Sequence, residues 1–311
     1  MNVDLSVEIG GLRLKNPVLT ASGTFGYGIE FADYLDLSRL GGIVTKGLSL
    51  LPRRGNPPPR IVETPSGLLN AIGLENVGLE NFARDILPAL AKTGTRVIVN
   101  FFGDSVEEYA QMAAELDGLG GVDALELNIS CPNVKAGGMA FGTRPESAAA
   151  VTAAVRARTG KTLIVKLSPA CDAVAVARAV AGAGADAVSC MNTIPAMAID
   201  PATRRPRLAN VTGGLSGPAV RPVAVKMTFD VARAVTIPVV GVGGIMSGDD
   251  ALEFVMAGAS GVEVGTANFT DPCAAVRVLD GIEAYCARHR VREYRTLIGS
   301  LLTDGAPTSC G

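Results

Sequence analysis

The chain has 311 residues, of which 48% are hydrophobic and 19% are charged, and its formal net charge is −2. This composition is typical of a folded protein with a large core and excludes a disordered chain. A net charge so close to zero provides no field that would attract nucleic acid, which disfavours a tight RNA- or DNA-binding function.

Two short apolar segments near the start, 7–9 and 12–14, flank Gly10-Gly11 and predict a β-hairpin. After them, β-branched runs alternate with alanine-rich helical stretches, which favours an α/β fold with a parallel sheet buried on both faces. The expected strands are 18–21, 42–45, 97–101, 124–128, 163–167, 187–191, 239–241 and 261–264. The expected helices are 80–92, 105–119, 145–158, 172–183, 222–234, 247–257 and 272–290.

Eight such strands separated by helices predict a single domain, 1–311, folded as a (β/α)8 TIM barrel whose bottom the hairpin closes. A doubly wound open sheet gives similar local signals and is the alternative. Two segments are too long for ordinary connections, the proline-rich 46–79 and the segment 192–221. We expect both to fold over the C-terminal face and to roof a pocket.

The cysteines and the single histidine limit the chemistry. The six cysteines are scattered, and His289 lies in a charged run. This pattern predicts reduced thiols, with no disulfide framework, no metal site and no iron-sulfur cluster. Catalysis by a histidine-activated serine or cysteine has no plausible base. The N-terminus lacks a basic or apolar leader and no run is long enough for a membrane span, so we expect a cytoplasmic protein.

Candidate functional groups follow the predicted strands, at the end where a parallel barrel places its active site. Glycines after the last two strands expose backbone N–H groups and predict a phosphate site, although each glycine alone could simply form a tight turn. Met246 stands where a dinucleotide fingerprint would have its third glycine. The strand-end residues are Ser22, Lys46, Asn100, Asn128, Lys166, Asn192-Thr193, Gly243-Gly244 and Gly265-Thr266.

Lysines and asparagines at these ends suggest the ligand. Lys46 and Lys166 both end apolar strands, where a fixed ammonium would stabilise the negative charge that a flavin gains on reduction. The alternative for Lys166 is a Schiff base, as in barrel aldolases. Asn70, Asn128 and Asn192 each offer a donor and an acceptor, which suits a planar imide or ureide; local backbone capping is the alternative.

The segment Asn128-Ile129-Ser130-Cys131-Pro132-Asn133 brings a thiol to the end of a predicted strand. Gly137-Gly138 follow within a few residues and predict a loop over the site. A buried structural cysteine is the alternative interpretation.

With these motifs, the chain resembles the dihydroorotate dehydrogenases over nearly its full length, and most closely the catalytic subunits of the class 1B, NAD-linked enzymes. Class 1A enzymes share the cysteine base and the FMN site, and class 2 enzymes use serine and carry a membrane extension. The motifs are Thr45-Lys46-Gly47, Arg53-Arg54-Gly55-Asn56-Pro57 through Glu63-Thr64-Pro65, Leu69-Asn70-Ala71-Ile72-Gly73-Leu74, Asn128-Ile129-Ser130-Cys131-Pro132-Asn133-Val134-Lys135, Val165-Lys166-Leu167-Ser168-Pro169, Asn192-Thr193, Gly213-Gly214-Leu215-Ser216-Gly217-Pro218, Gly241-Val242-Gly243-Gly244-Ile245 and Gly265-Thr266-Ala267-Asn268.

The resemblance implies a mechanism and a set of site residues. Cys131 would remove the C5 proton of (S)-dihydroorotate while the C6 hydride passes to FMN, giving orotate for pyrimidine biosynthesis. Met191 departs from the family, which has a β-branched aliphatic residue there. The implied substrate residues are Lys46, Asn70, Ala71, Ile72, Gly73, Leu74, Asn128, Asn192 and Thr193. The implied FMN residues are Ser22, Lys46, Gly47, Asn100, Asn128, Lys166, Met191, Gly217, Gly243, Gly244, Gly265 and Thr266.

The resemblance also implies a partner. A class 1B enzyme passes electrons to NAD through a separate subunit that carries FAD and a [2Fe-2S] cluster, and two such subunits join a homodimer of the catalytic chain in a heterotetramer. A class 1A enzyme would instead use fumarate without a partner. Outside the family, the alternatives are a non-redox phosphate-binding aldolase and a flavin barrel acting on uridine in RNA; the net charge disfavours the latter.

Overall fold

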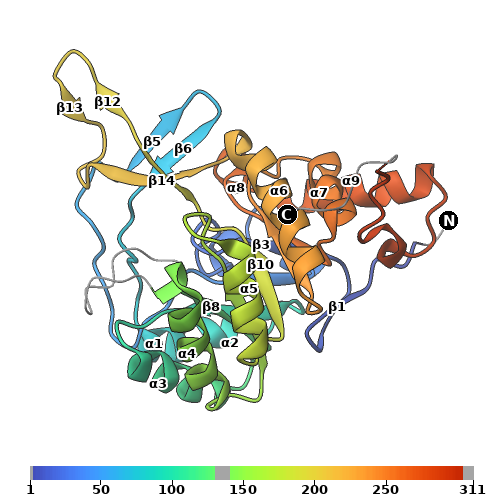
Figure 1. Ribbon diagram of the computed structural model, residues 1–311, viewed down its shortest axis with the longest axis horizontal. Coiled ribbons are helices and arrows are strands. Elements are labelled where there is room, and N and C mark those ends of the chain that lie inside the picture. Colours follow the sequence, from blue (N-terminus) through green and yellow to red (C-terminus); the bar gives the residue numbers. More distant parts are fainter. Residues whose placement is uncertain (1–2, 130–140, 304–311) are drawn as a thin grey trace.

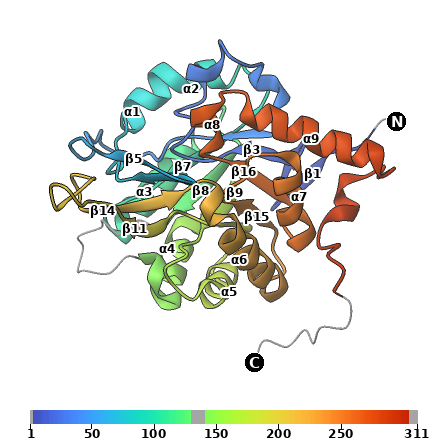
Figure 2. The same cartoon turned by 90° about the horizontal axis from the view of Figure 1, so that it is seen from above.

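The computed structural model describes residues 3–129 and 141–303, and its central feature is a closed parallel barrel. The strands follow one another around the barrel in the order β10-β15-β16-β3-β4-β7-β8-β9, with helices outside them (Figures 1 and 2). The predicted (β/α)8 barrel is therefore confirmed, and the open doubly wound sheet is excluded. The barrel strands are β3 (Val18–Thr20), β4 (Gly42–Val44), β7 (Arg96–Phe101), β8 (Ala124–Asn128), β9 (Thr162–Lys166), β10 (Ala187–Cys190), β15 (Val239–Val242) and β16 (Gly261–Val264).

The strands form where the sequence has short, nearly continuous apolar runs. Every residue of β8, β10, β15 and β16 is buried, because side chains on one face fill the barrel and those on the other contact the helices. The observed ends differ from the predicted ones by at most one residue, and for β8 and β16 they coincide.

The outer helices begin at the start signals that the sequence contains. The Ser105 side chain accepts a hydrogen bond from Glu108 N at the start of α3, and Ser247 forms a capping box with Asp250 at the start of α7. Such caps are worth about 1 kcal/mol each. One face of each helix is buried on the barrel. The helices after the third barrel strand are α3 (Val106–Asp117), α4 (Pro145–Arg156), α5 (Ala173–Gly182), α6 (Arg221–Ala234), α7 (Gly248–Ala257), α8 (Ala267–Thr270) and α9 (Ala274–Arg288); short 3-10 turns are Ile29–Phe31, Leu37–Arg39, Phe141–Thr143, Pro218–Val220 and Tyr294–Leu297.

One predicted helix is wrong in detail. The helix expected at 80–92 is divided into α1 (Leu79–Asn81), a wider π-helical turn (Phe82–Ile86) and α2 (Leu87–Leu90). Pro88 has no N–H to donate to the preceding turn, so an uninterrupted α-helix is disfavoured there. The helix expected at 272–290 is confirmed as α9, and the short α8 precedes it.

The predicted hairpin lies at the N-terminal end of the barrel. β1 (Val7–Ile9) pairs with β2 (Leu12–Leu14) in antiparallel register. Thr162, the first residue of β9, donates its hydroxyl to Gly10 O over 2.8 Å. Gly10 has a φ of +55°, and a Cβ there would be 2.6 Å from Asp186 just before β10, so glycine is required at this close approach. The hairpin thus covers the bottom of the barrel, as predicted.

The two long segments after the second and sixth barrel strands form one additional sheet, which the sequence did not predict. β5 (Ile61–Thr64) and β6 (Gly67–Asn70) come from the first segment, and β11 (Ile194–Met197) and β14 (Thr212–Ser216) from the second. Their order is β11-β14-β6-β5, so β6 and β14 join the two segments. A separate ribbon of β12 (Ile199–Asp200) and β13 (Arg205–Pro206) extends beyond this sheet (Figure 1).

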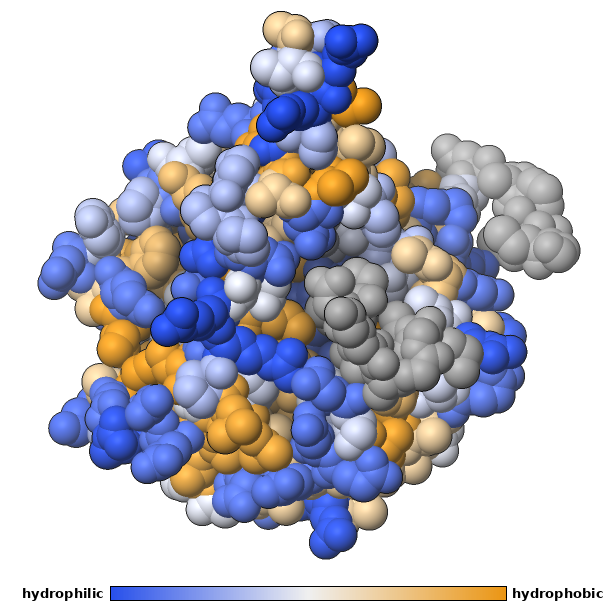
Figure 3. Space-filling view, turned by 90° about the vertical axis from the view of Figure 1, so that its left-hand side faces the viewer, coloured by the Kyte–Doolittle hydropathy of each residue, from blue (hydrophilic) through white to orange (hydrophobic). Residues whose placement is uncertain are grey.

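This sheet and ribbon project from the barrel, and several of their apolar side chains are exposed. Figure 3 shows the projecting sheet and ribbon at the top of the view, with apolar side chains at the base of the projection among polar ones. No helix in the ranges 3–129 and 141–303 is both long and apolar enough to cross a membrane. The exposed apolar residues on or beside the projection include Ile61, Met197, Ile199 and Val211.

Candidate active site

The parallel barrel brings the predicted strand-end residues to one end. Asn128 and Lys166 end adjacent strands and are register partners. Lys46 follows β4, and its backbone N–H donates to Gly26 O over 2.8 Å. Ser22 follows Ala21, whose N–H donates to Val264 O at the end of the last strand. Ser22, Lys46, Asn128 and Lys166 therefore lie at the same, C-terminal end of the barrel.

Side chains from the four neighbouring strands β7 to β10 and from β16 form a buried polar cluster. Asn100 Nδ2 donates to Glu126 Oε1 over 2.6 Å, and Ser189 Oγ donates to Glu126 Oε2 over 2.9 Å. Lys166 Nζ lies 3.3 Å from Glu126 Oε1 and 3.0 Å from Glu263 Oε2. Both glutamates are missing from the sequence prediction. Each interrupts an apolar strand, Leu125-Glu126-Leu127 and Val262-Glu263-Val264, and that interruption was the available signal.

The cluster fixes the charge of Lys166. Burial by itself would lower the pKa of Lys166, but its interactions with Glu126 and Glu263 outweigh burial and raise that pKa above its ordinary value. The side chain therefore stays an ammonium ion at neutral pH. This disfavours the aldolase alternative, because a Schiff base forms only from a neutral amine.

Beside the cluster, the structure has open hydrogen-bonding capacity. Among the described residues, Asn100 Oδ1 and Thr45 Oγ1 are buried without a hydrogen-bond partner. Gly47 lies against Asn100: a Cβ on Gly47 would be 2.9 Å from Asn100 Oδ1. A buried unpaired amide oxygen is costly, so a ligand with an N–H group would be stabilised there.

The glycines predicted to form a phosphate site do converge. A Cβ on Gly244 would be 2.8 Å from Gly217 O, and Gly217 itself adjoins Thr266. Thr266 Oγ1 donates to Ser216 Oγ over 2.8 Å, which joins the end of β14 to the end of β16. Met191 is buried, and its N–H donates to Val242 O beside Gly243. Gly217, Gly243 and Gly244 all have positive φ, a backbone conformation that favours glycine over residues with a side chain.

The predicted substrate residues are brought together by the additional sheet. Asn70 is the register partner of Gly214, and its Nδ2 donates to Gly214 O over 3.4 Å. Gly214 packs directly against Thr193: a Cβ on this glycine would overlap the Thr193 side chain. Asn192 Oδ1 accepts a hydrogen bond from Thr193 N over 2.7 Å. Pairing of β6 with β14 therefore places Asn70 next to the Asn192-Thr193 segment, which is distant in sequence.

The remaining segment that was predicted to bind substrate, Ala71 to Leu74, is held by the chain at 56–60. Ala71 N donates to Arg60 O, and Asn56 N donates to Ile72 O. Gly73 has a φ of +77° and packs against Asn56. At the same place Glu75 Oε2 lies 2.7 Å from Arg60 Nη2 and 3.5 Å from Lys46 Nζ. Glu75 thus connects Lys46 to this segment.

The predicted catalytic residue, Cys131, lies outside the described residues. On either side of it, Ile129 O accepts a hydrogen bond from Gly142 N over 2.9 Å. Tyr109 Oη donates to Asn128 O over 2.8 Å and fixes the end of β8.

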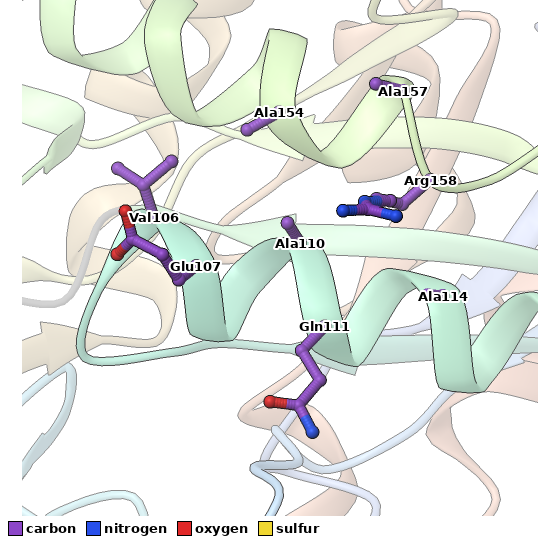
Figure 4. Close-up of a pocket in the computed structure, with 8 residues that line it drawn as sticks. All are labelled: Val106, Glu107, Ala110, Gln111, Ala114, Ala154, Ala157 and Arg158. Atoms are coloured by element: carbon purple, nitrogen blue, oxygen red, sulfur yellow. The ribbon is translucent and has the colours of Figure 1, made fainter.

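A separate groove of about 530 Å³ lies between α3 and α4 (Figure 4). None of the predicted site residues lines it. The groove belongs to the outer helix layer and has no strand-end residue, so it contributes nothing to the barrel site. It is lined by Val106, Glu107, Ala110, Gln111, Ala114, Ala154, Ala157 and Arg158.

Comparison with known proteins identifies the family. The family model for dihydroorotate dehydrogenase matches residues 4–286. The chain belongs to the dihydroorotate dehydrogenase family. This confirms the prediction made from the motifs.

Three relatives are similar to this chain over most of its length. All three are named dihydroorotate dehydrogenase B (NAD(+)), catalytic subunit. The protein from Trichlorobacter lovleyi is 59% identical over 97% of this chain and 99% of its own length. Those from Geotalea daltonii and Geobacter sulfurreducens are each 58% identical over 96% of this chain and 98% of their own lengths. Within the dihydroorotate dehydrogenase family, the similarity is thus to the NAD-linked class, as predicted.

Proposed function

We propose that this chain is the catalytic subunit of an NAD-linked dihydroorotate dehydrogenase that oxidises (S)-dihydroorotate to orotate in pyrimidine biosynthesis. The observation that carries the proposal is the family match over residues 4–286. Two structural facts add support: the predicted polar groups meet at one end of the barrel, and Lys166 is held as an ammonium ion. The class 1A, fumarate-dependent enzyme is the alternative within the family.

We assign FMN to this site because the residues fit it. The unpaired Asn100 Oδ1 could accept from an N–H of the flavin ring, Lys166 could face its electron-rich edge, and the glycines could bind its phosphate. When bound, FMN supplies the hydride acceptor. The assigned set is Ser22, Lys46, Gly47, Asn100, Asn128, Lys166, Met191, Gly217, Gly243, Gly244, Gly265 and Thr266.

The chain's own residues would orient the substrate and move one proton. Asn70, Asn192 and Thr193 offer paired donors and acceptors to the pyrimidine ring, and Lys46 offers a cation to its carboxylate. Cys131 is the general base that would remove the proton from C5. The proposed substrate residues are Lys46, Asn70, Ala71, Ile72, Gly73, Leu74, Asn128, Asn192 and Thr193.

We further propose that electrons leave through a separate subunit carrying FAD and a [2Fe-2S] cluster, in a heterotetramer of two catalytic and two electron-transfer chains. The words "catalytic subunit" in the relatives' names support a partner. A cytoplasmic location, and a single domain over residues 1–311, stay predictions.

A visible spectrum tests the cofactor directly. The purified chain should be yellow, with flavin absorption that dihydroorotate bleaches under anaerobic conditions. Acid extraction should release FMN and not FAD. A colourless chain that cannot be reconstituted with FMN would contradict the proposal.

Replacing Gly244 with valine should weaken FMN binding about ten- to a hundredfold, because overpacking of this kind costs about 1–3 kcal/mol. A side chain there meets Gly217 O and Arg221 and would separate the proposed phosphate-binding N–H groups. Gly160→Val is the matched control, since a Cβ at Gly160 meets no atom within 4 Å. Fluorescence titration of the flavin-free variants gives the affinities. Equal FMN affinity in the two folded variants would place the phosphate elsewhere.

A further inference from the structure

The buried cluster contains more acidic groups than its single lysine can neutralise. The exposed fraction of Glu126 is 0%, that of Glu263 is 1% and that of Lys166 is 4%. Both carboxyl groups lie within 3.3 Å of the same Lys166 Nζ, which brings them close to each other. If both were ionised, two like charges would face each other away from water, at a cost of several kcal/mol per ion.

The hydrogen bonds show which carboxyl group carries the negative charge. Both oxygens of Glu126 accept hydrogen bonds, from Asn100, Ser189 and Lys166. By contrast, Glu263 Oε1 has no hydrogen-bond partner among the described residues when it is counted as an acceptor. A hydrogen bond between the two carboxyl groups would require one proton. That proton placed on Glu263 gives its oxygen a partner and leaves Glu126 as the acceptor.

The electrostatics agree with this placement. Burial and then the charge of Glu126 raise the pKa of Glu263 well above its ordinary value. Burial also acts on Glu126, but Lys166 and the hydrogen bonds outweigh it and lower that pKa. The third titratable group against Glu263 is the Cys190 thiol, whose pKa is raised above all by burial, so this thiol stays neutral. Asn100 and Ser189 do not titrate.

We propose that Glu263 is protonated at neutral pH and donates this proton in a hydrogen bond to Glu126, so that Lys166 faces one negative charge instead of two. Glu263 is a positioning residue: it holds the lysine in place without cancelling its charge. The consequence for a flavin rests on the proposed function, because only then does the ammonium stabilise the charge gained on reduction. The protonation itself is a property of the chain alone.

The first experiment uses the flavin-free chain. Because the raised pKa keeps Glu263 protonated when folded, unfolding above the ordinary glutamate pKa of about 4.3 releases one proton. The unfolding equilibrium constant of the wild type, divided by that of Glu263→Gln, should therefore rise about tenfold per pH unit from about pH 5 upwards. Glu115→Gln, at an exposed carboxylate on α3, should give a ratio that does not change with pH.

Infrared spectroscopy reads the same proton without unfolding. The difference spectrum between the wild type and Glu263→Gln at pH 7 should contain the C=O stretch of a protonated carboxylic acid. A carboxylate band in its place, or a pH-independent unfolding ratio, would overturn the proposal.

The second experiment measures the flavin midpoint potential in a double-mutant cycle. If the two carboxyl groups share one negative charge, Glu126 stays ionised in Glu263→Gln, and Glu263 becomes ionised in Glu126→Gln. Each single variant should therefore keep the potential close to that of the wild type, and the double variant should raise it. If both carboxyl groups were ionised in the wild type, each single substitution would raise the midpoint potential, and the two increases would add in the double variant. That result would overturn the proposal. Failure of the chain to bind FMN would contradict the proposed function and leave the flavin-free experiments decisive.

Discussion

Replacing Cys131 with alanine should slow the reduction of bound flavin by dihydroorotate about 10²-fold or more, because a general base contributes about that much to the rate. The flavin should stay bound, since the proposed FMN residues are unchanged. Anaerobic stopped-flow measurement of flavin bleaching reads this half-reaction without any electron acceptor. A near-normal rate of bleaching in Cys131→Ala would remove the assignment of Cys131 as the base.

Cys273→Ala is the matched control for this substitution. Cys273 is a thiol at the start of α9, where its Sγ donates to Tyr34 O. Its loss should leave the rate of flavin reduction unchanged. Cys190 cannot replace Cys131 as the base, because burial raises the pKa of the Cys190 thiol and keeps it protonated.

The pH dependence of flavin reduction follows from the thiol. Only the thiolate accepts a proton, and a free cysteine has a pKa of about 8.5. The rate should therefore rise with pH towards that value and then level off. In Cys131→Ser the rise should be absent over the same range, because the serine hydroxyl does not ionise there. A rate that is independent of pH in the wild type would contradict a thiolate base.

The barrel could be predicted because each of its strands is a local apolar run. In β16, Gly261–Val264, all residues are buried, and a short run of this kind between turn residues is typical of a parallel strand. Once the strands are predicted, their C-terminal ends are known as well. Because these ends meet on one side of a parallel barrel, the common location of Lys46, Asn128 and Lys166 could also be predicted. Such features depend on residues that are close in sequence.

The additional sheet could not be predicted, because its pairing is non-local. Asn70 of β6 pairs with Gly214 of β14 across a large part of the chain. The strand β5, Ile61–Thr64, has no buried residue, so it lacks the apolar pattern of a core strand. Only the turn residues Pro65-Ser66 between β5 and β6 marked a hairpin. The sequence therefore predicted a cover over the barrel but not its structure.

The two glutamates of the buried cluster were missed for a different reason. Glu126 and Glu263 lie within apolar strands and not at the strand ends, where the sequence pattern indicates functional groups. Their partner Lys166 was predicted from its position, but its ion pairs require strands on different sides of the barrel. A charged residue inside an apolar strand is rarely buried without a partner, so both glutamates could have been paired with Lys166 at the outset.

The purified catalytic chain should reduce NAD⁺ negligibly, because nothing proposed for this chain carries electrons from FMN to a dinucleotide. Artificial acceptors should restore turnover, since they reach the flavin without a partner. Adding an electron-transfer subunit that carries FAD and a [2Fe-2S] cluster should then give NAD⁺ reduction. Steady-state assays with dihydroorotate and each acceptor measure all three rates. Rapid NAD⁺ reduction by the single chain would remove the need for a partner.

Fumarate separates the two classes within the family. A class 1A enzyme reduces fumarate at the same flavin without any other subunit, so the single chain would turn over rapidly with dihydroorotate and fumarate. The NAD-linked proposal predicts slow turnover under the same conditions, even though the flavin is reduced normally by dihydroorotate. The reductive half-reaction serves as the control, because it is common to both classes and shows that the chain is active. Rapid fumarate reduction with normal flavin bleaching would therefore overturn the NAD-linked assignment while leaving the family and the cysteine base intact.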